Sequence, residues 1–219
     1  MQAGDLPSFR LPLVIDVSSP DIQVGIAHDQ GWIGLIASSG QVMDCLLPTI
    51  DQLFKRHDGS FQQLDALFYC CGPGSTLGLR LAASVVKTLL WEKEYKIPFF
   101  QYNALDLASC MTKIEPQSLQ APFRMGRRII RTGERAKVGK KEIVDEQAAM
   151  QKYPQSLHLA GPRKIALEIP HDQILEYNLE KVKGLSDLYP LAEATDQPVP
   201  YSPEPAKFVK WQGKIPAKK

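Results

Sequence analysis

The run from Gly72 to Arg80 carries residue types that could bind an anion. It holds three glycines, and Ser75 or Thr76 could cap a helix that begins there. A glycine turn that leads into a helix directs backbone N–H groups toward one point, which suits a phosphate group. The spacing matches neither G-x-G-x-x-G nor G-x-x-x-x-G-K-[ST]. A tight structural turn is therefore the favoured interpretation, because glycines at strand ends mostly serve geometry, and a phosphate-binding turn is the alternative.

A second candidate is the basic stretch, which we define as residues 124–141. It contains eight lysines and arginines against Glu134 alone. Positive charge at this density could contact RNA phosphates without reading bases, through Arg124, Arg127, Arg128 and Arg131. Aromatic residues that would stack on single-stranded bases are missing from the stretch. A basic surface that only faces water is the more frequent outcome, so RNA contact is the alternative.

The sequence indicates no other chemistry. The four cysteines and four histidines show no zinc spacing and no histidine pair at helical spacing, and no G-x-S-x-G segment provides a nucleophile. An ATP-driven kinase would need a second phosphate loop in the second half of the chain, and the sequence shows none there. We therefore expect no catalytic residue, no metal site and no cofactor held by this chain alone.

The composition is ordinary for a globular protein, with 44% hydrophobic and 23% charged residues among 219. Charge is unevenly distributed, since residues 1–120 carry a net −4 and residues 121–219 a net +6, which suggests an anionic partner for the second half. No apolar run approaches the ~20 residues that span a bilayer, and no signal-peptide pattern is present. We expect a cytoplasmic protein without membrane contact.

The periodicity of apolar residues predicts the elements that position the glycine turn. Short β-rich runs predict strands, and a one-sided apolar arc of roughly 140° predicts an amphipathic helix before the central strand. In order, we expect strands at 11–17, 22–28 and 31–37, a helix at 42–56, a strand at 66–71, a helix from the turn to about Glu94, a strand at 97–102 and a helix at 104–113. This order places three antiparallel strands before parallel strands with helical crossovers.

The periodicity weakens after residues 116–122. Strand-like runs occupy residues 123–132 and 157–169, helices could form at 145–152 and 175–188, and prolines predict an extended tail from Tyr189 onward. We therefore expect two units, residues 1–115 and a reduced second unit at residues 116–219.

The helix after the glycine turn has more apolar surface than one sheet can cover. Its apolar residues fill an arc of roughly 200°, whereas packing on a sheet needs little more than about 100°. The surplus could pack on the helix at 42–56, or it could form an interface with another subunit. The residues predicted for such an interface are Val42, Leu46, Leu79, Ala82, Ala83, Val86 and Leu90. The pattern alone leaves both interpretations open.

Gly72-Pro73-Gly74-Ser75-Thr76-Leu77-Gly78-Leu79-Arg80 resembles the GPGSFTGLR signature of the bacterial TsaB (YeaZ) family, in the glycopeptidase M22-like superfamily. The order of elements in the first half is also similar, and the likeness is faint beyond Ala121. Thr76-Leu77 stands where the family has Phe-Thr, and Ser39-Gly40-Gln41 stands where the family often has His-Ser-Glu. These departures leave room for a paralogue with a different partner.

The resemblance implies an α/β protein with the actin-type ATPase (ribonuclease H-like) fold in two half-domains, the second degenerate. It implies a non-catalytic scaffold subunit for threonylcarbamoyladenosine modification of tRNA. Such a subunit pairs through the helices of its first half with a TsaD-type catalytic subunit or with itself, and a TsaE-type ATPase docks on the pair. tRNA would then be bound indirectly, and ATP or ADP only in the assembled complex.

The resemblance also implies a vestigial nucleotide site at Asp16, Gly72, Gly74, Ser75 and Gly78. In that superfamily an aspartate at the end of the first strand typically faces phosphate and metal. The alternative is a turn in which Asp16 bonds Ser18 and Ser19. Two competing functions follow: an autonomous small-molecule kinase or ATPase that uses this site, and an RNA-binding module led by the basic stretch.

Overall fold

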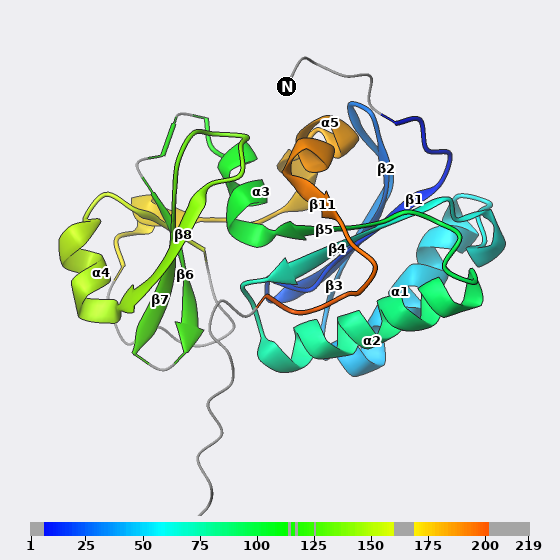
Figure 1. Cartoon of the computed structure of the whole chain (residues 1–219), viewed down its shortest axis with the longest axis horizontal. Helices are drawn as coiled ribbons and strands as arrows, with labels where there is room; N and C mark the ends of the chain where they lie inside the picture. Colours follow the sequence, from blue (N-terminus) through cyan, green and yellow to red (C-terminus); the bar gives the residue numbers. More distant parts are fainter. Residues whose placement is uncertain (1–6, 114, 117, 125, 160–168, 202–219) are drawn as a thin grey trace, which may run out of the picture.

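The computed structural model describes residues 7–113, 115–116, 118–124, 126–159 and 169–201, and Figure 1 shows them as two lobes. Within these ranges the first lobe contains a six-stranded sheet in the order β11-β5-β4-β1-β2-β3, with the helices packed on it. The second lobe contains a five-stranded sheet in the order β10-β9-β6-β7-β8, with one helix, α4. No helix in the described part of the chain has both the length and the apolar character needed to cross a bilayer.

The elements of the first lobe follow the predicted order, with small shifts at their ends. They are β1 Pro12–Asp16, β2 Asp21–His28, β3 Gly31–Ser39, α1 Val42–Arg56, β4 Ala66–Gly72, α2 Thr76–Glu92, β5 Phe99–Asn103 and α3 Ala104–Cys110. Strand β1 pairs antiparallel with β2 and parallel with β4, β3 pairs antiparallel with β2, and β5 pairs parallel with β4. The predicted strand and helix order of this half is therefore confirmed.

Helices cover both faces of the first sheet (Figure 1). Leu13 and Ile15 of β1 pack in the apolar cluster that contains α1 and α2, whereas Val14 packs in the cluster on the other face, with α3 and α5. This alternation follows from the two-residue period of a strand. Cys70 and Cys71 are likewise divided between the two clusters, as their adjacency on β4 predicts.

The second lobe consists of β6 Leu119–Arg124, β7 Arg127–Thr132, β8 Lys140–Asp145, α4 Glu146–Lys152, β9 Leu157–Leu159 and β10 Ile174–Leu175. The predicted run at residues 123–132 divides at Gly126, whose φ of +73° makes the turn between β6 and β7. The helix predicted at 145–152 is confirmed as α4. Strand β8 was not predicted, because its sequence KKEIVD has little apolar alternation.

The helix predicted at residues 175–188 is wrong over most of its length. Strand β10 ends at Leu175, a 3-10 turn follows at Leu179–Lys181, and only α5, Gly184–Leu188, is helical. Gly184 has a φ of +49°, and a Cβ there would lie 2.0 Å from the carbonyl oxygens of His28 and Gly31, which end β2 and begin β3. The chain bends at this glycine because only glycine permits so close an approach.

The predicted tail from Tyr189 onward is not extended throughout. Ala192–Ala194 forms β11, which pairs antiparallel with β5 and completes one edge of the first sheet. Farther on, the backbone N–H of Tyr201 donates to the carbonyl of Cys71 at 2.7 Å. Residues 160–168 of the strand-like run predicted at 157–169, and the tail beyond Tyr201, lie outside the described residues.

Candidate functional site

The glycine turn joins β4 to α2 and packs against the backbone that follows β1. Gly72 has a φ of +118°, and the side chain of Ser75 caps α2 by accepting from the Gly78 N–H at 3.4 Å. A Cβ on Gly74 would lie 2.7 Å from the Cα and 2.9 Å from the carbonyl oxygen of Ser18. The close approach of two backbone segments therefore explains why position 74 is a glycine. This supports the structural interpretation of the turn.

Asp16 is fully buried, and protein donors use both of its carboxylate oxygens. Oδ1 accepts from the backbone N–H of Ser18 at 2.8 Å and from its hydroxyl at 2.6 Å. Oδ2 accepts from the hydroxyl of Tyr102 at 2.8 Å and from that of Tyr177 at 2.6 Å. The predicted bond to Ser18 is confirmed, whereas Ser19 bonds the carbonyl of Asp21 instead.

The two tyrosines keep their protons in this setting. Burial raises the pKa of Tyr102 and of Tyr177 well above the ordinary value, and the nearby charge of Asp16 raises both further. Both hydroxyls therefore act as donors to Asp16. The residues of the vestigial nucleotide site do come together, but Asp16 is enclosed by hydroxyls and does not face an open phosphate position. The sequence carried no signal for Tyr177, which lies 161 positions from Asp16.

The cysteines and histidines do not assemble a metal site in the described part of the chain, where no group of three or more His, Cys, Asp or Glu side chains could hold a metal ion. Burial raises the pKa of Cys71 to about 12 and that of Cys110 to about 11. These thiols are therefore protonated at neutral pH and pack as small apolar side chains.

Arg131 in the basic stretch points inward. It is fully buried, and its Nε lies 3.1 Å from Oδ1 of Asp106 on α3, whose other oxygen pairs with Lys141 at 2.5 Å. The remaining guanidinium nitrogens donate to the carbonyls of Gly133, Glu134 and Lys137. The Arg131 guanidinium is thus fully engaged with this chain and is not available to RNA.

Arg128 is buried in a second polar cluster. Its Nε donates to Gln120 at 2.6 Å, Nη1 pairs with Glu146 at 3.2 Å, and Nη2 lies 3.0 Å from Nδ1 of His158. Burial lowers the pKa of Arg128, and burial together with the Arg128 charge lowers the pKa of His158 to about 4. His158 is therefore neutral at pH 7 and accepts from Arg128.

The basic stretch is consequently more structural than its sequence suggests. Arg135 donates to the carbonyls of Thr112 and Cys110, which caps the C-terminal end of α3. Arg127 is the most exposed of the three arginines of β7, and its Nε lies 4.0 Å from Asp145. The side chain of Arg124 lies outside the described residues. The predicted RNA contact by Arg128 and Arg131 is wrong, because ion pairs inside the protein hold both guanidinium groups.

Helices α1 and α2 lie side by side on one face of the first sheet (Figure 1). They approach closely at their first turns, where a Cβ on Gly78 would lie 3.2 Å from Cγ2 of Val42. Most of the residues predicted for a partner interface are buried in the same apolar cluster of this chain: Leu46, Leu79, Ala82, Ala83, Val86 and Leu90. Val42 is half-buried beside them. The sheet and the neighbouring helix therefore cover the apolar arc of α2, and these residues are not free to form the predicted partner interface.

Other apolar residues of the same helices are exposed. Met43 is 68% exposed and Leu47 52% exposed on α1, and Leu77 is 66% and Trp91 68% exposed on α2. Leu77, Leu81, Ser84, Thr88 and Trp91 recur at helical spacing and form one stripe on α2. The hydroxyls of Ser84 and Thr88 donate to the carbonyls one turn earlier, so these two polar groups of the stripe already have hydrogen-bond partners within α2. We call Met43 and Leu47 together with this stripe the outer face of α1 and α2.

Comparison with known proteins identifies the relatives of this fold. The family model described as "TsaD: tRNA N6-adenosine threonylcarbamoyltransferase" matches residues 38–177. The structure resembles YeaZ from Pseudomonas aeruginosa with a TM-score of 0.59 and 14% identity, covering 87% of this chain and 98% of that chain. A comparison with curated protein sequences finds no match.

A second solved structure agrees. It is described as an uncharacterized protein with similarity to peptidase YeaZ from Pseudomonas aeruginosa, and it matches with a TM-score of 0.56 and 16% identity over 78% of this chain and 87% of that chain. The actin-type fold and the resemblance to the TsaB (YeaZ) family are thereby confirmed.

Proposed function

This chain belongs to the family described as TsaD, tRNA N6-adenosine threonylcarbamoyltransferase, and from that premise we propose that it is a non-catalytic subunit of this tRNA modification system. It pairs with a TsaD-type catalytic subunit through the outer face of α1 and α2. A TsaE-type ATPase docks on the assembled pair, and tRNA is held mainly by the partners.

The outer face is the observation that carries the proposal. Four large apolar side chains, Met43, Leu47, Leu77 and Trp91, are each more than half exposed there. Exposed apolar residues that cluster on one face favour a protein partner, since their burial would contribute about 1.5–3 kcal/mol for each large side chain. A catalytic subunit of the same fold would present two corresponding helices, and four helices would then pack together.

The site around Asp16 supports a non-catalytic role. Its carboxylate is enclosed by Tyr102, Tyr177 and Ser18, and the turn at Gly74 lies against the Ser18 backbone. A nucleotide phosphate and its metal ion would have to displace these donors. The autonomous kinase or ATPase is therefore the weaker proposal.

Binding to the TsaD-type subunit of the same cell tests the proposal. Leu47→Glu places a charge in the contact, and we expect its affinity for that subunit to fall at least about 100-fold, because a charge in a packed interface is desolvated without a partner. Val138→Glu is the matched control, since Val138 is 64% exposed on the second lobe and its replacement should leave affinity unchanged.

Both variants should unfold at the denaturant concentration of the wild type, because both side chains are exposed. Unchanged affinity of a folded Leu47→Glu protein would place the partner contact elsewhere.

A further inference from the structure

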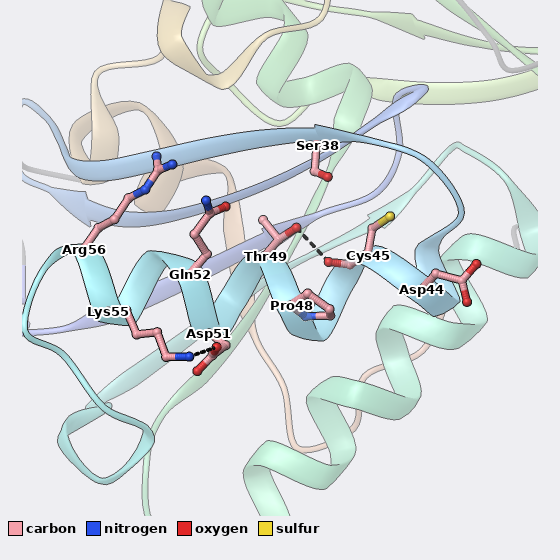
Figure 2. A pocket seen from close by; sticks show the side chains of 9 residues that line it. All are labelled: Ser38, Asp44, Cys45, Pro48, Thr49, Asp51, Gln52, Lys55 and Arg56. Carbon is pink, nitrogen blue, oxygen red and sulfur yellow. Dashed lines mark hydrogen bonds and ion pairs between the residues drawn. The ribbon is translucent and has the colours of Figure 1, made fainter.

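A groove lies along the edge of the first sheet, away from the outer face of α1 and α2. In the described part of the chain the sheet ends at β3, so one side of this strand has no neighbouring strand. A cavity of about 530 Å³ runs beside this edge, lined by Ser38 of β3 and by α1 side chains from Asp44 to Arg56 (Figure 2). An edge strand next to an open groove can accept further structure.

The side chains of the groove divide by charge along α1. Pro48, Thr49 and Gln52 lie near its middle, and the Thr49 hydroxyl donates to the Cys45 carbonyl at 2.7 Å. Asp44 lies at one end of the groove and Arg56 at the other (Figure 2). Between these ends, Asp51 and Lys55 of the lining form an ion pair with each other at 2.6 Å. The remaining charges of the groove, Asp44 and Arg56, are therefore of opposite sign and lie at its two ends.

Strand β3 lacks the side chains that usually protect an edge. Gly31–Ser39 contains no charged residue and no proline. A bulge separates the pairs on either side of Ile33, and the regular part of the strand is Gly34–Ser39. Another strand could therefore pair with β3 over these six residues.

We propose that a second copy of this chain occupies the groove, with the two β3 strands paired antiparallel across a two-fold axis. Such pairing keeps α1 of both copies on the same face of a continuous sheet and runs the two helices antiparallel. Asp44 of each copy then comes opposite Arg56 of the partner subunit. The contact is self-complementary, as a two-fold interface requires.

The spacing of strands and helices favours a second copy over a single extended peptide. Helix α1 packs on β2 and β3, so its axis lies between them. With paired strands ~4.8 Å apart, the two α1 axes would be about 10 Å apart, which is an ordinary distance for packed helices. The partner's helix would then fill the groove, whereas a lone peptide would pair with β3 and leave the flank of α1 open.

Sedimentation equilibrium of the full chain tests this proposal. The chain carries Leu47→Glu, so that any association through the outer face is abolished. We expect a dimer that Arg56→Glu weakens at least about tenfold, because two like-charge contacts replace two attractive ones. The double variant D44K/R56E should restore the affinity to within about threefold. Arg56 and Asp44 are exposed in the last and first turns of α1, so the variants should stay folded and lose at most about 1 kcal/mol of stability at each position through the helix dipole.

Cross-linking provides an independent readout. Arg56→Cys places a thiol next to Cys45 of the partner subunit, and mild oxidation should link the two chains, while R56C/C45S should not link. The other cysteines, Cys70, Cys71 and Cys110, are buried and do not compete. A chain that stays monomeric, a dimer unaffected by Arg56→Glu, a double variant without recovery or a missing cross-link would each overturn the proposal. None of these results bears on the outer face, so this proposal and the proposed function can fail separately.

Discussion

The α1–α2 layer of the first lobe and the basic stretch of the second lobe use their side chains in opposite ways. In the first, apolar residues at helical spacing pack on the sheet, and a few large ones are left exposed on the outer face. In the second, Arg128 and Arg131 are buried in ion pairs, although their sequence resembles a charged surface. An excess of one residue type in a segment therefore does not by itself mark a binding surface. The exposure of these side chains in the folded protein determines whether they can bind a partner.

The largest effect is expected at the buried ion pairs of the second lobe. Arg131→Met would remove one of the two ionic partners of buried Asp106 and the donor to three carbonyl groups, and we expect a loss of about 3–5 kcal/mol in the free energy of unfolding. Arg127→Met should lose less than about 1 kcal/mol, since its pair is partly exposed. Urea denaturation measures both. A stable Arg131→Met protein with weakened tRNA binding would return the stretch to an RNA-binding role.

A smaller effect separates the two sides of α2. Val86 is fully buried, so Val86→Ala should lose about 2 kcal/mol of stability, which combines lost burial with a cavity. Leu77→Ala should change the free energy of unfolding by less than about 0.5 kcal/mol, because Leu77 is exposed. The same urea measurement applies. Comparable losses at the two positions would mean that the outer face already contributes to the core of the isolated chain.

The smallest effect is the pH dependence of the second lobe. The folded pKa of His158, about 4, lies below its ordinary value of 6.5, so the unfolded chain binds more protons between these values. Stability should therefore fall as pH drops from about 6.5 to about 4, with roughly 1–2 kcal/mol lost at pH 5 from this group. His158→Gln should flatten the dependence in this window. If the variant's stability depends on pH as steeply as that of the wild type, groups other than His158 cause the dependence.

The sequence predicts most of the first lobe because apolar periodicity determines where its strands and helices lie. Val42–Arg56 is helical between the predicted bounds, and Ser75 caps α2 as expected. The helix at residues 175–188 could not be rejected from sequence, because Gly184 is fixed by contact with a connection more than 150 residues earlier. Strand β8 was missed because its partly buried positions carry charged residues.

The candidate site was predicted only in part. Asp16 and the glycine turn do lie together, but their neighbours Tyr102 and Tyr177 come from distant segments with no recognisable motif. The exposed residues Leu77 and Trp91 fall outside the apolar arc of α2, so helical spacing could have indicated them. The buried arginines could not be distinguished from surface ones, because their partners Asp106 and Glu146 have no fixed spacing from them.

We propose that this chain acts in tRNA modification by binding a catalytic subunit through the outer face of α1 and α2. Threonylcarbamoyladenosine formation by the TsaD-type subunit, with the TsaE-type ATPase present, tests it most directly. We expect no product from this chain alone, full activity with the wild-type chain, and activity at least about tenfold lower with Leu47→Glu, while Val138→Glu supports the full rate. Product formed by this chain without the catalytic subunit, or full activity with folded Leu47→Glu, would contradict the claim.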